Sequence, residues 1–194
     1  MRCSPASWGK ILPRSFYARS AEQVARELLG AFLIHHVGGV TLAGRIVETE
    51  AYLGLDDRAA HAWHGLTGRT RVLFGPPGHA YVYLIYGMYE CLNLVAESEG
   101  RAGCVLIRAL EPLNGSENCS GPARLTKAMG ITRAHYGADV TGGPLTVRAD
   151  PFPRTEPIAA SPRIGIRLCA TWPLRFYLEG NPHVSCFKLK WAAR

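Results

Sequence analysis

The sequence predicts a single α+β domain built on an antiparallel or mixed sheet. Its 194 residues, 47% of them hydrophobic, suffice to bury one substantial core. Two pairs of strand-like apolar segments are each separated by a glycine turn, which is typical of β-hairpins. The chain contains neither an internal repeat nor a clear linker, so we expect no second folded domain.

The N-terminal region is expected to hold a basic arm followed by a short helix. Residues 1–15 carry three basic and no acidic side chains, and they lack the apolar core of a signal peptide. We therefore expect residues 1–15 to form a flexible arm, with an organelle-targeting presequence as the alternative, and the folded domain to span 16–194. Ser20 and Gln23 match a capping box, and apolar residues at helical spacing follow them as far as Gly30.

The sheet is predicted from hairpins and short apolar runs. The predicted strands are 31–37 and 40–52 around Gly38-Gly39, 79–86 and 88–97 around Gly87, and 103–110. Between the hairpins, residues 55–78 are rich in Gly and Pro and are predicted to be a loop, which at that length is usually functional. Pro122 and Gly130 bracket a short helix, and further short strands follow between prolines and glycines.

Charge and composition narrow the function classes. The formal net charge of +7 favours a polyanionic partner, although a basic surface can also serve solubility alone. The basic residues are spread through folded-looking segments, which indicates a folded binding face and not a disordered arm. No apolar run reaches the roughly 18 residues of a membrane helix, so no membrane partner is expected. None of the six cysteines lies in a C-x-x-C pair, so we expect no zinc site and a reducing compartment.

One strand carries the clearest chemical signal. In RIVETEAYLG, residues 45–54, side-chain alternation places Glu48, Glu50 and Tyr52 on one side. A carboxylate beside an aromatic ring can activate water next to a flat, stacked substrate. Glu50 is the first candidate base, and periodicity does not exclude Glu48. Arg108 lies in the apolar run CVLIRAL and is expected to turn inward toward a carboxylate, either in an active site or in a structural ion pair.

Tyrosines and one histidine add a candidate binding surface. Tyr81 and Tyr83 face the same way on one predicted strand, where aromatic residues commonly just pack a core. Tyr86 lies beside Gly87 at a hairpin tip, where a bulky ring suits a wedge inserted between base pairs. His61 has no partner at zinc spacing, so a stacking or hydrogen-bonding role fits better.

These segments together resemble one family, the alkyladenine (3-methyladenine) DNA glycosylases of the mammalian type. The matching segments, in order, are RIVETEAYLG, DDRAAHA, FGPPGHAYVYLIYGMYECLN, CVLIRALEPL, SGPARL, PRIGI and LRFYLEGNPHVS, and they fall between about Val24 and Ser185. The resemblance implies a single mixed α/β domain around a curved antiparallel sheet, with a protruding β-hairpin that inserts into DNA. It implies a monofunctional enzyme of base excision repair that flips alkylated or deaminated purines from duplex DNA and hydrolyses their N-glycosidic bond. The substrates implied are 3-methyladenine, 7-methylguanine, hypoxanthine and ethenoadenine.

The resemblance also assigns roles to residues. Glu50 would be the general base and Arg108 would help to hold the attacking water. Tyr52, His61 and Tyr83 would stack on the flipped base, and Asn93 would disfavour the exocyclic amino group of guanine. Tyr86 would fill the gap in the duplex. No metal or organic cofactor is implied, and we expect a monomer whose partner is double-stranded DNA containing damaged purines. We expect it to be cytoplasmic, associated with the nucleoid if the protein is bacterial, or nuclear if it is eukaryotic.

One departure from the family concerns DNA contacts. Between residues 113 and 120 this chain has only NGSENCS where the family generally carries a longer basic stretch, which removes candidate phosphate contacts. The remaining candidates for backbone contacts are Arg45, Arg69, Arg124 and Lys127. The alternatives to a glycosylase are a non-catalytic module that stacks bases on an aromatic sheet and a hydrolase of free nucleosides or sugars.

Overall fold

The computed structural model describes residues 8–115, 117–152 and 154–185. Its strands are β1 (Phe32–Val37), β2 (Val40–Tyr52), β3 (Ala80–Ile85), β4 (Tyr89–Ala96), β5 (Gly103–Pro112), β6 (Leu145–Arg148), β7 (Ile158–Ser161) and β8 (Arg175–Leu178). Its α-helices are α1 (Arg14–Tyr17), α2 (Ala21–Glu27) and α3 (Pro122–Ala128). The short 3-10 helices are η2 (Gly54–Asp56), η3 (His61–His64), η4 (Arg71–Phe74) and η5 (Arg133–His135). The predicted α+β class is confirmed.

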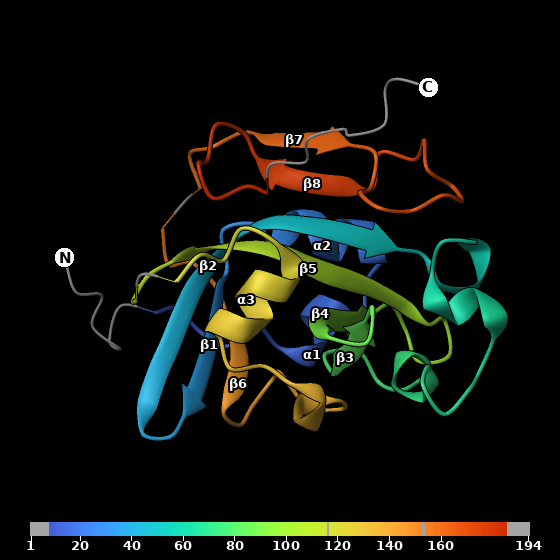
Figure 1. Ribbon diagram of the computed structural model, residues 1–194, viewed down its shortest axis with the longest axis horizontal. Helices are drawn as coiled ribbons and strands as arrows, with labels where there is room; N and C mark the ends of the chain where they lie inside the picture. The colour runs from blue at the N-terminus through green and yellow to red at the C-terminus, as the bar shows by residue number, and fades with distance from the viewer. Residues whose placement is uncertain (1–7, 116, 153, 186–194) are drawn as a thin grey trace.

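The strands form one curved antiparallel sheet that branches at β2 (Figure 1). The main order is β3-β4-β5-β2-β1-β6, with every neighbouring pair antiparallel. The first half of β2 pairs with β1, whereas Glu48–Glu50 pair with β8, which in turn pairs with β7. Residues Glu48–Glu50 of β2 therefore pair with β5 along one edge of the strand and with β8 along the other.

Both predicted hairpins are confirmed. β1 and β2 pair from Phe32 opposite Arg45 to Val37 opposite Val40. Gly38 and Gly39 between them have φ of 58° and 75°, values that favour glycine and that explain the Gly-Gly turn. β3 and β4 pair from Ala80 opposite Leu94 to Ile85 opposite Tyr89, and this hairpin is green in Figure 1.

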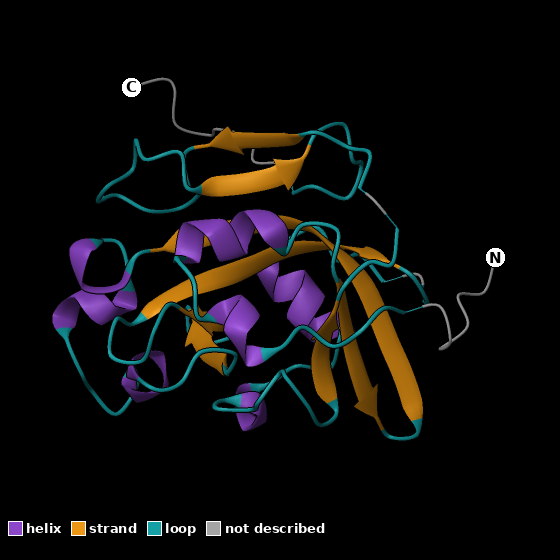
Figure 2. Ribbon diagram, turned by 180° about the vertical axis from the view of Figure 1, so that it is seen from behind, coloured by secondary structure: helices purple, strands orange, loops and turns teal. Residues whose placement is uncertain are grey.

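The helices cover one face of the sheet, as the reverse view shows (Figure 2). Side chains of α1, α2 and α3 share a buried core with alternate residues of the strands, Val105, Ile107 and Ala109 of β5 among them. The Ser20 side chain accepts a hydrogen bond from the Gln23 N–H at 3.3 Å, so the predicted N-cap of α2 is confirmed. The intervening residues of the strands face the other way, and that second face carries the site.

Two regions differ from expectation. Within the expected N-terminal arm, residues 8–15 pack along β6: the Leu12 N–H donates to Val147 O at 2.9 Å, and Ile11 forms a bridge with Arg148. The packed part of the chain thus begins before residue 16, and residues 1–7 lie outside the described ranges. The predicted loop 55–78 contains η3 and η4 and the end of η2, because its side chains pack into a second small core around Ala62, Leu73 and Tyr81.

Four cysteines fall within the described residues, and all four are free thiols: Cys91, Cys104, Cys119 and Cys169. Cys3 and Cys186 lie outside those residues. None of the helices described is long and apolar enough to cross a membrane.

Candidate active site

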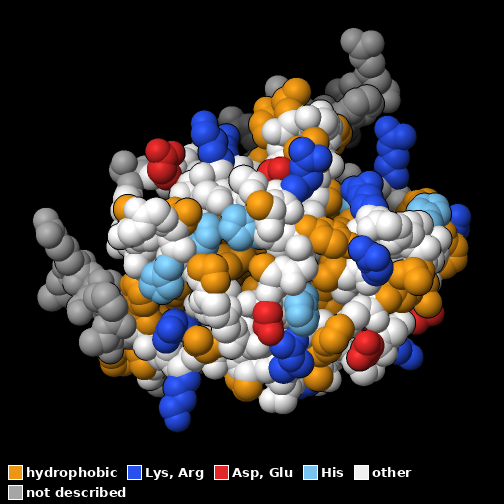
Figure 3. Space-filling model, turned by 90° about the horizontal axis from the view of Figure 1, so that it is seen from below, with side chains coloured by type: hydrophobic (Ala, Val, Ile, Leu, Met, Phe, Trp, Pro, Cys, Tyr) orange, Lys and Arg blue, Asp and Glu red, His pale blue; other side chains and the backbone are white. Residues whose placement is uncertain are grey.

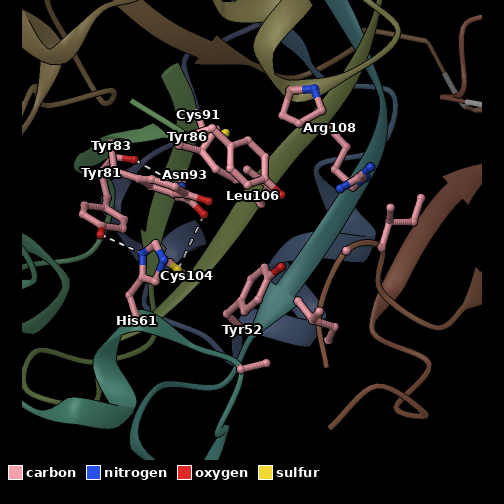
Figure 4. A pocket seen from close by; sticks show the side chains of 16 residues that line it. Tyr52, His61, Tyr81, Tyr83, Tyr86, Cys91, Asn93, Cys104, Leu106 and Arg108 are labelled. Atoms are coloured by element: carbon pink, nitrogen blue, oxygen red, sulfur yellow. Dashed lines mark hydrogen bonds between the residues drawn. The ribbon is translucent and has the colours of Figure 1, made fainter. Parts of the chain in front are cut away.

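A cavity of about 420 Å³ lies on the second face of the sheet, and Pro122 at the start of α3 also lines it. Alternate residues of β2, β3, β4 and β5 line it, because every second side chain of a strand points to the same face. From β5 these are Cys104, Leu106 and Arg108, whose neighbours in the sequence point into the core. In Figure 4, His61, Tyr81 and Tyr83 lie together on one side of the cavity, with Tyr52 and Arg108 on another.

Arg108 joins the two carboxylates of β2. Its Nε lies 2.9 Å from Glu48 Oε1, and its Nη1 lies 3.3 Å from Glu50 Oε1. The expectation that Glu48, Glu50 and Tyr52 share one side of the strand is confirmed, since the Tyr52 hydroxyl also donates to Glu50 Oε2 at 2.9 Å. The inward turn predicted for Arg108 is confirmed as well, because its side chain is only 8% exposed.

Glu48 is saturated with hydrogen-bond donors. Besides Arg108, it accepts hydrogen bonds from Arg175 Nε at 2.7 Å and from the N–H and hydroxyl of Ser185 at 2.7 and 2.9 Å. Burial alone would raise the pKa of Glu48, but Arg108, Ser185 and Arg175 outweigh it and hold that pKa below its ordinary value. Glu48 is therefore ionised at neutral pH and fixes the position of Arg108.

Glu50 has the opposite electrostatic setting. It accepts from the Ile164 N–H at 2.7 Å and from Tyr52, yet burial raises its pKa above the ordinary value despite these donors and Arg108. The carboxylate is fully buried and lies behind Tyr52, Arg108 and Ile164, which themselves line the cavity. A carboxyl group with a raised pKa at this depth is a stronger base than a solvated one.

The aromatic walls hold one another in place. His61 lies edge-on to Tyr83 with ring centroids 4.5 Å apart, and its Nδ1 is 2.8 Å from the Tyr81 hydroxyl oxygen. Burial, followed by the nearby charges of Arg69 and His64, lowers the pKa of His61 to about 4, so the imidazole is neutral at neutral pH. Burial raises the pKa of Tyr81 to about 12 and also raises those of Tyr52 and Tyr83, so these rings stay uncharged.

Asn93 is buried at the cavity wall on β4. Its Nδ2 donates to Tyr81 O at 3.3 Å, and its Oδ1 accepts a weak hydrogen bond from Cys104 Sγ at 3.9 Å. These two contacts with different partners fix which end of the amide is the donor and which the acceptor. The side chain is thus presented to the cavity in one orientation.

Tyr86 lies at the tip of the β3–β4 hairpin and lines the mouth of the cavity. Its side chain is among the most exposed large hydrophobic groups of the chain, with a relative exposure of 81%. Its φ of 53° is in the left-handed region, which is unfavourable for a tyrosine by about 1–2 kcal/mol. An exposed aromatic ring on a strained turn is not explained by core packing.

The basic residues proposed for phosphate contact are placed differently. Arg45 is surrounded by carboxylates, with Glu156 at 2.5 Å, Glu111 at 3.6 Å and Asp150 at 3.9 Å, so its charge is already neutralised and we no longer propose it for this role. Three other candidates have exposed side chains: Arg69, Arg124 and Lys127. On the face in Figure 3, Lys and Arg side chains are dispersed among hydrophobic and uncharged groups rather than gathered in one patch.

Several site residues were missed by sequence reasoning. Ile164, Arg175 and Ser185 reach the two carboxylates from the last third of the chain. Arg163 is fully buried, forms two hydrogen bonds with Asp57 and lies over the Tyr52 ring at 4.6 Å from its centroid. Their segments PRIGI and LRFYLEGNPHVS were recognised only as part of the resemblance. A basic residue amid apolar neighbours, as at Arg163, is the one local signal available.

In the part of the chain that the structure describes, no group of three His, Cys, Asp or Glu side chains could hold a metal ion. The cavity and the residues behind it offer carboxylates, guanidinium groups and aromatic rings. Tyr52 lies on one side of the cavity and His61, Tyr81 and Tyr83 on another (Figure 4), and the buried carboxyl group of Glu50 lies behind Tyr52. Fold and cavity together define an α+β protein whose aromatic cavity lies next to a buried carboxyl group.

The comparisons with known proteins agree with this class. The family model of methylpurine-DNA glycosylase (MPG) matches residues 15–182. A protein of Myxococcus xanthus named "Putative 3-methyladenine DNA glycosylase" is 49% identical over 181 residues, which cover 90% of this chain and 93% of that protein. Proteins of the same name from Legionella pneumophila strain Lens and Methanocella arvoryzae are each 49% identical, with 90% of this chain and 97% and 96% of those proteins covered.

The chain belongs to the methylpurine-DNA glycosylase family. The family expected from the sequence is thereby confirmed. The members are DNA repair enzymes that hydrolyse N-glycosyl bonds, so the protein is a methylpurine-DNA glycosylase of base excision repair acting on DNA.

Proposed function

We propose that this protein is a monofunctional glycosylase that flips alkylated or deaminated purines out of duplex DNA and releases them as free bases. The substrates in this proposal are 3-methyladenine, 7-methylguanine, hypoxanthine and ethenoadenine. The observation that carries the proposal is Glu50, a buried carboxyl group with a raised pKa that contacts three lining residues of an aromatic cavity, Tyr52, Arg108 and Ile164.

In the proposed reaction Glu50 removes a proton from a water held where Tyr52, Arg108 and Ile164 meet the cavity. The water oxygen bonds to the sugar C1′ as the N-glycosidic bond breaks, and the bonding electrons leave with the purine. A purine alkylated at N3 or N7 is cationic and leaves as a neutral base. Hypoxanthine and ethenoadenine leave as anions unless a group of the site donates a proton or a hydrogen bond to them.

The aromatic walls support the base-binding step. Tyr52, His61 and Tyr83 offer uncharged ring faces and edges of the size needed to enclose one purine. We propose that Asn93 disfavours normal guanine, because its fixed amide leaves little room for the exocyclic amino group. Damaged bases pair and stack poorly, so their extrusion costs less than that of normal bases.

Extrusion needs a group that fills the gap in the duplex, and Tyr86 is proposed for it. Its ring is exposed and lies at the mouth of the cavity, so one side chain could occupy the duplex while the base enters. Losing the stacking and pairing of one base costs a few kilocalories per mole, of which an inserted aromatic ring restores a part.

The proposed partner is double-stranded DNA bound by a cytoplasmic monomer. Arg69, Arg124 and Lys127 are the remaining candidates for phosphate contacts. With water as nucleophile the product is an abasic site and the strand stays intact. Strand cleavage would need an amine that forms a Schiff base, and the cavity lining in the described chain includes no lysine.

The test is base release from duplex oligonucleotides that carry one hypoxanthine or ethenoadenine, with Glu50→Gln beside the wild type. Release by the wild type alone, with alkali-labile sites as product, is the expected result. If the wild type releases neither base, methylated DNA is the next substrate. A wild type that binds lesion DNA yet releases no base from any of these substrates would identify a non-catalytic binding module. Release of bases from free nucleosides with equal efficiency would point to a nucleoside hydrolase.

A further inference from the structure

Tyr52 and Tyr83, two of the aromatic residues that line the cavity, each have an arginine guanidinium group over one face of the ring. The Arg163 guanidinium lies 4.6 Å from the centroid of Tyr52, and that of Arg69 lies 5.2 Å from the centroid of Tyr83. Neither arginine lines the cavity, whereas both tyrosines do. The cations therefore occupy the faces of these rings that are turned away from a bound base.

The two arginines differ in their charge balance. Arg163 is paired with Asp57, and Arg108 and Arg175 are balanced by Glu48 and Glu50, so these groups add little net charge. Arg69 makes no ion pair among the residues that the structure describes. Its Nη2 instead lies 3.5 Å from His61 Nε2, the second ring of the same wall.

Arg69 reaches Tyr83 from a neighbouring groove. This groove has a volume of about 550 Å³, and its lining includes Arg69, Arg133 and Tyr136. Tyr83 lines both the groove and the cavity, so this residue lies between them. The Arg69 guanidinium lies 5.2 Å from the centroid of the ring that is proposed to stack on a base in the cavity.

This arrangement has an electrostatic consequence for the base. The face of an aromatic ring attracts a cation, but a cation already present on one face repels a second cation on the other. A purine alkylated at N3 or N7 carries a positive charge, whereas hypoxanthine and ethenoadenine are neutral. His61 is neutral and adds no charge of its own to the wall.

We propose that Arg69 is a specificity-determining residue that biases the cavity against cationic purines and toward neutral ones. This inference rests on the proposed glycosylase function, and it concerns the ranking of substrates rather than the reaction. The role does not require contact with substrate: Arg69 acts through the ring of Tyr83 and through its position against His61.

The experiment compares kcat/KM for duplexes carrying 7-methylguanine, which is cationic, and hypoxanthine, which is neutral. Arg69→Gln is expected to raise the ratio of the cationic to the neutral substrate by about threefold to tenfold, as expected for loss of one partly solvated charge at this distance. Arg69→Lys retains the charge and should shift the ratio less. Arg69 is exposed, so none of these changes disturbs the core.

Arg133→Gln is the matched control. Arg133 lines the same groove but pairs with Glu90 at 3.4 Å, and it covers neither wall of the cavity. Its removal should leave the substrate ratio unchanged, whatever it does to DNA affinity. A second readout is the NMR titration of His61, whose pKa should rise in Arg69→Gln because the neighbouring cation is gone.

The outcomes separate the two proposals. If Arg69→Gln lowers both rates equally, so that their ratio stays unchanged as in Arg133→Gln, Arg69 is a phosphate contact only and the inference is wrong. If the wild type releases neither base, the proposed function fails and the inference fails with it. A raised ratio in Arg69→Gln, absent from Arg133→Gln, establishes the specificity role.

Discussion

Glu48 and Glu50 lie two residues apart on β2 and contact the same guanidinium group, yet their pKa values shift in opposite directions. The difference comes from their other partners. Two arginines and Ser185 saturate Glu48, whereas Glu50 receives one backbone N–H and the Tyr52 hydroxyl besides Arg108. One carboxylate is thereby fixed as a structural anion, and the other remains able to gain and lose a proton.

Glu48→Gln should destabilise the fold. It would leave Arg108 and Arg175 buried with only one carboxylate between them, at a cost of about 3–5 kcal/mol in the free energy of unfolding. Because the pKa of Glu48 is lowered on folding, its stabilisation is present above the unfolded-state value near 4.5 and is lost as the pH falls through the folded-state value. Urea unfolding at pH 7 and pH 4 measures both effects. Glu22→Gln removes a carboxylate from an exposed pair with Arg26 and should cost about 0.5 kcal/mol or less.

Tyr52→Phe should shift the pH dependence of base release. The hydroxyl stabilises the charged form of Glu50, so its removal raises the pKa of that carboxyl group further. Activity requires the carboxylate, so the acid limb of the single-turnover rate profile for hypoxanthine release should move to higher pH. The ring that stacks on the base is retained. An acid limb that stays in place would argue against Glu50 as the group that titrates.

Tyr86→Gly should separate stability from activity. Glycine removes the left-handed strain at this position but adds backbone entropy to the unfolded chain, so the free energy of unfolding should be unchanged or rise by up to about 1 kcal/mol. Base release from duplex DNA should fall at least about tenfold, which is the loss of about 1.4 kcal/mol of transition-state stabilisation. Tyr86→Ala serves as control, because it removes the ring without relieving the strain. Full activity of either variant would contradict the wedge role.

Asn93→Ala should allow release of undamaged guanine. If the amide disfavours the exocyclic amino group, its removal should raise guanine release on the order of tenfold, the equivalent of about 1.4 kcal/mol. Hypoxanthine lacks that amino group, so its release serves as the internal control. Cys104→Ala removes only the thiol that donates to Asn93 Oδ1 and should have a smaller effect in the same direction. Guanine release that stays at the wild-type level would exclude this role of Asn93.

Side-chain alternation was the most reliable guide from sequence to site. It predicted that Glu48, Glu50 and Tyr52 share a face, and this prediction is confirmed. The apolar run around Arg108 separately predicted that this residue turns inward, which is confirmed as well. Alternation did not distinguish the two carboxylates, because their difference depends on Ile164 and on residues still later in the chain. Contacts over more than a hundred residues leave no local pattern in a single sequence.

The lack of a local pattern for distant contacts also explains why Arg45 was expected to be available for a phosphate contact. A charged residue in a strand is commonly solvent-exposed, so its neighbours in the sequence gave no reason to expect a buried ion-pair cluster. Its partners Glu111, Asp150 and Glu156 come from β5 and from the segment before β7. The two hairpins, in contrast, were predictable because a glycine turn and its flanking strands are adjacent in the chain.

Several partners of Glu48 and Glu50 lie more than a hundred residues later in the sequence, and this has a consequence for synthesis on the ribosome. A nascent chain that has emerged only as far as β5 contains both carboxylates and Arg108, but it lacks the Ile164 N–H, Arg175 and Ser185. The hydrogen bonds that give Glu48 and Glu50 their different chemistry cannot form until the chain has emerged beyond Ser185. In the reaction proposed for Glu50, a chain that stops at β5 would therefore carry the two carboxylates without the partners that set them apart, and base release would begin only after the later segments have packed against β2.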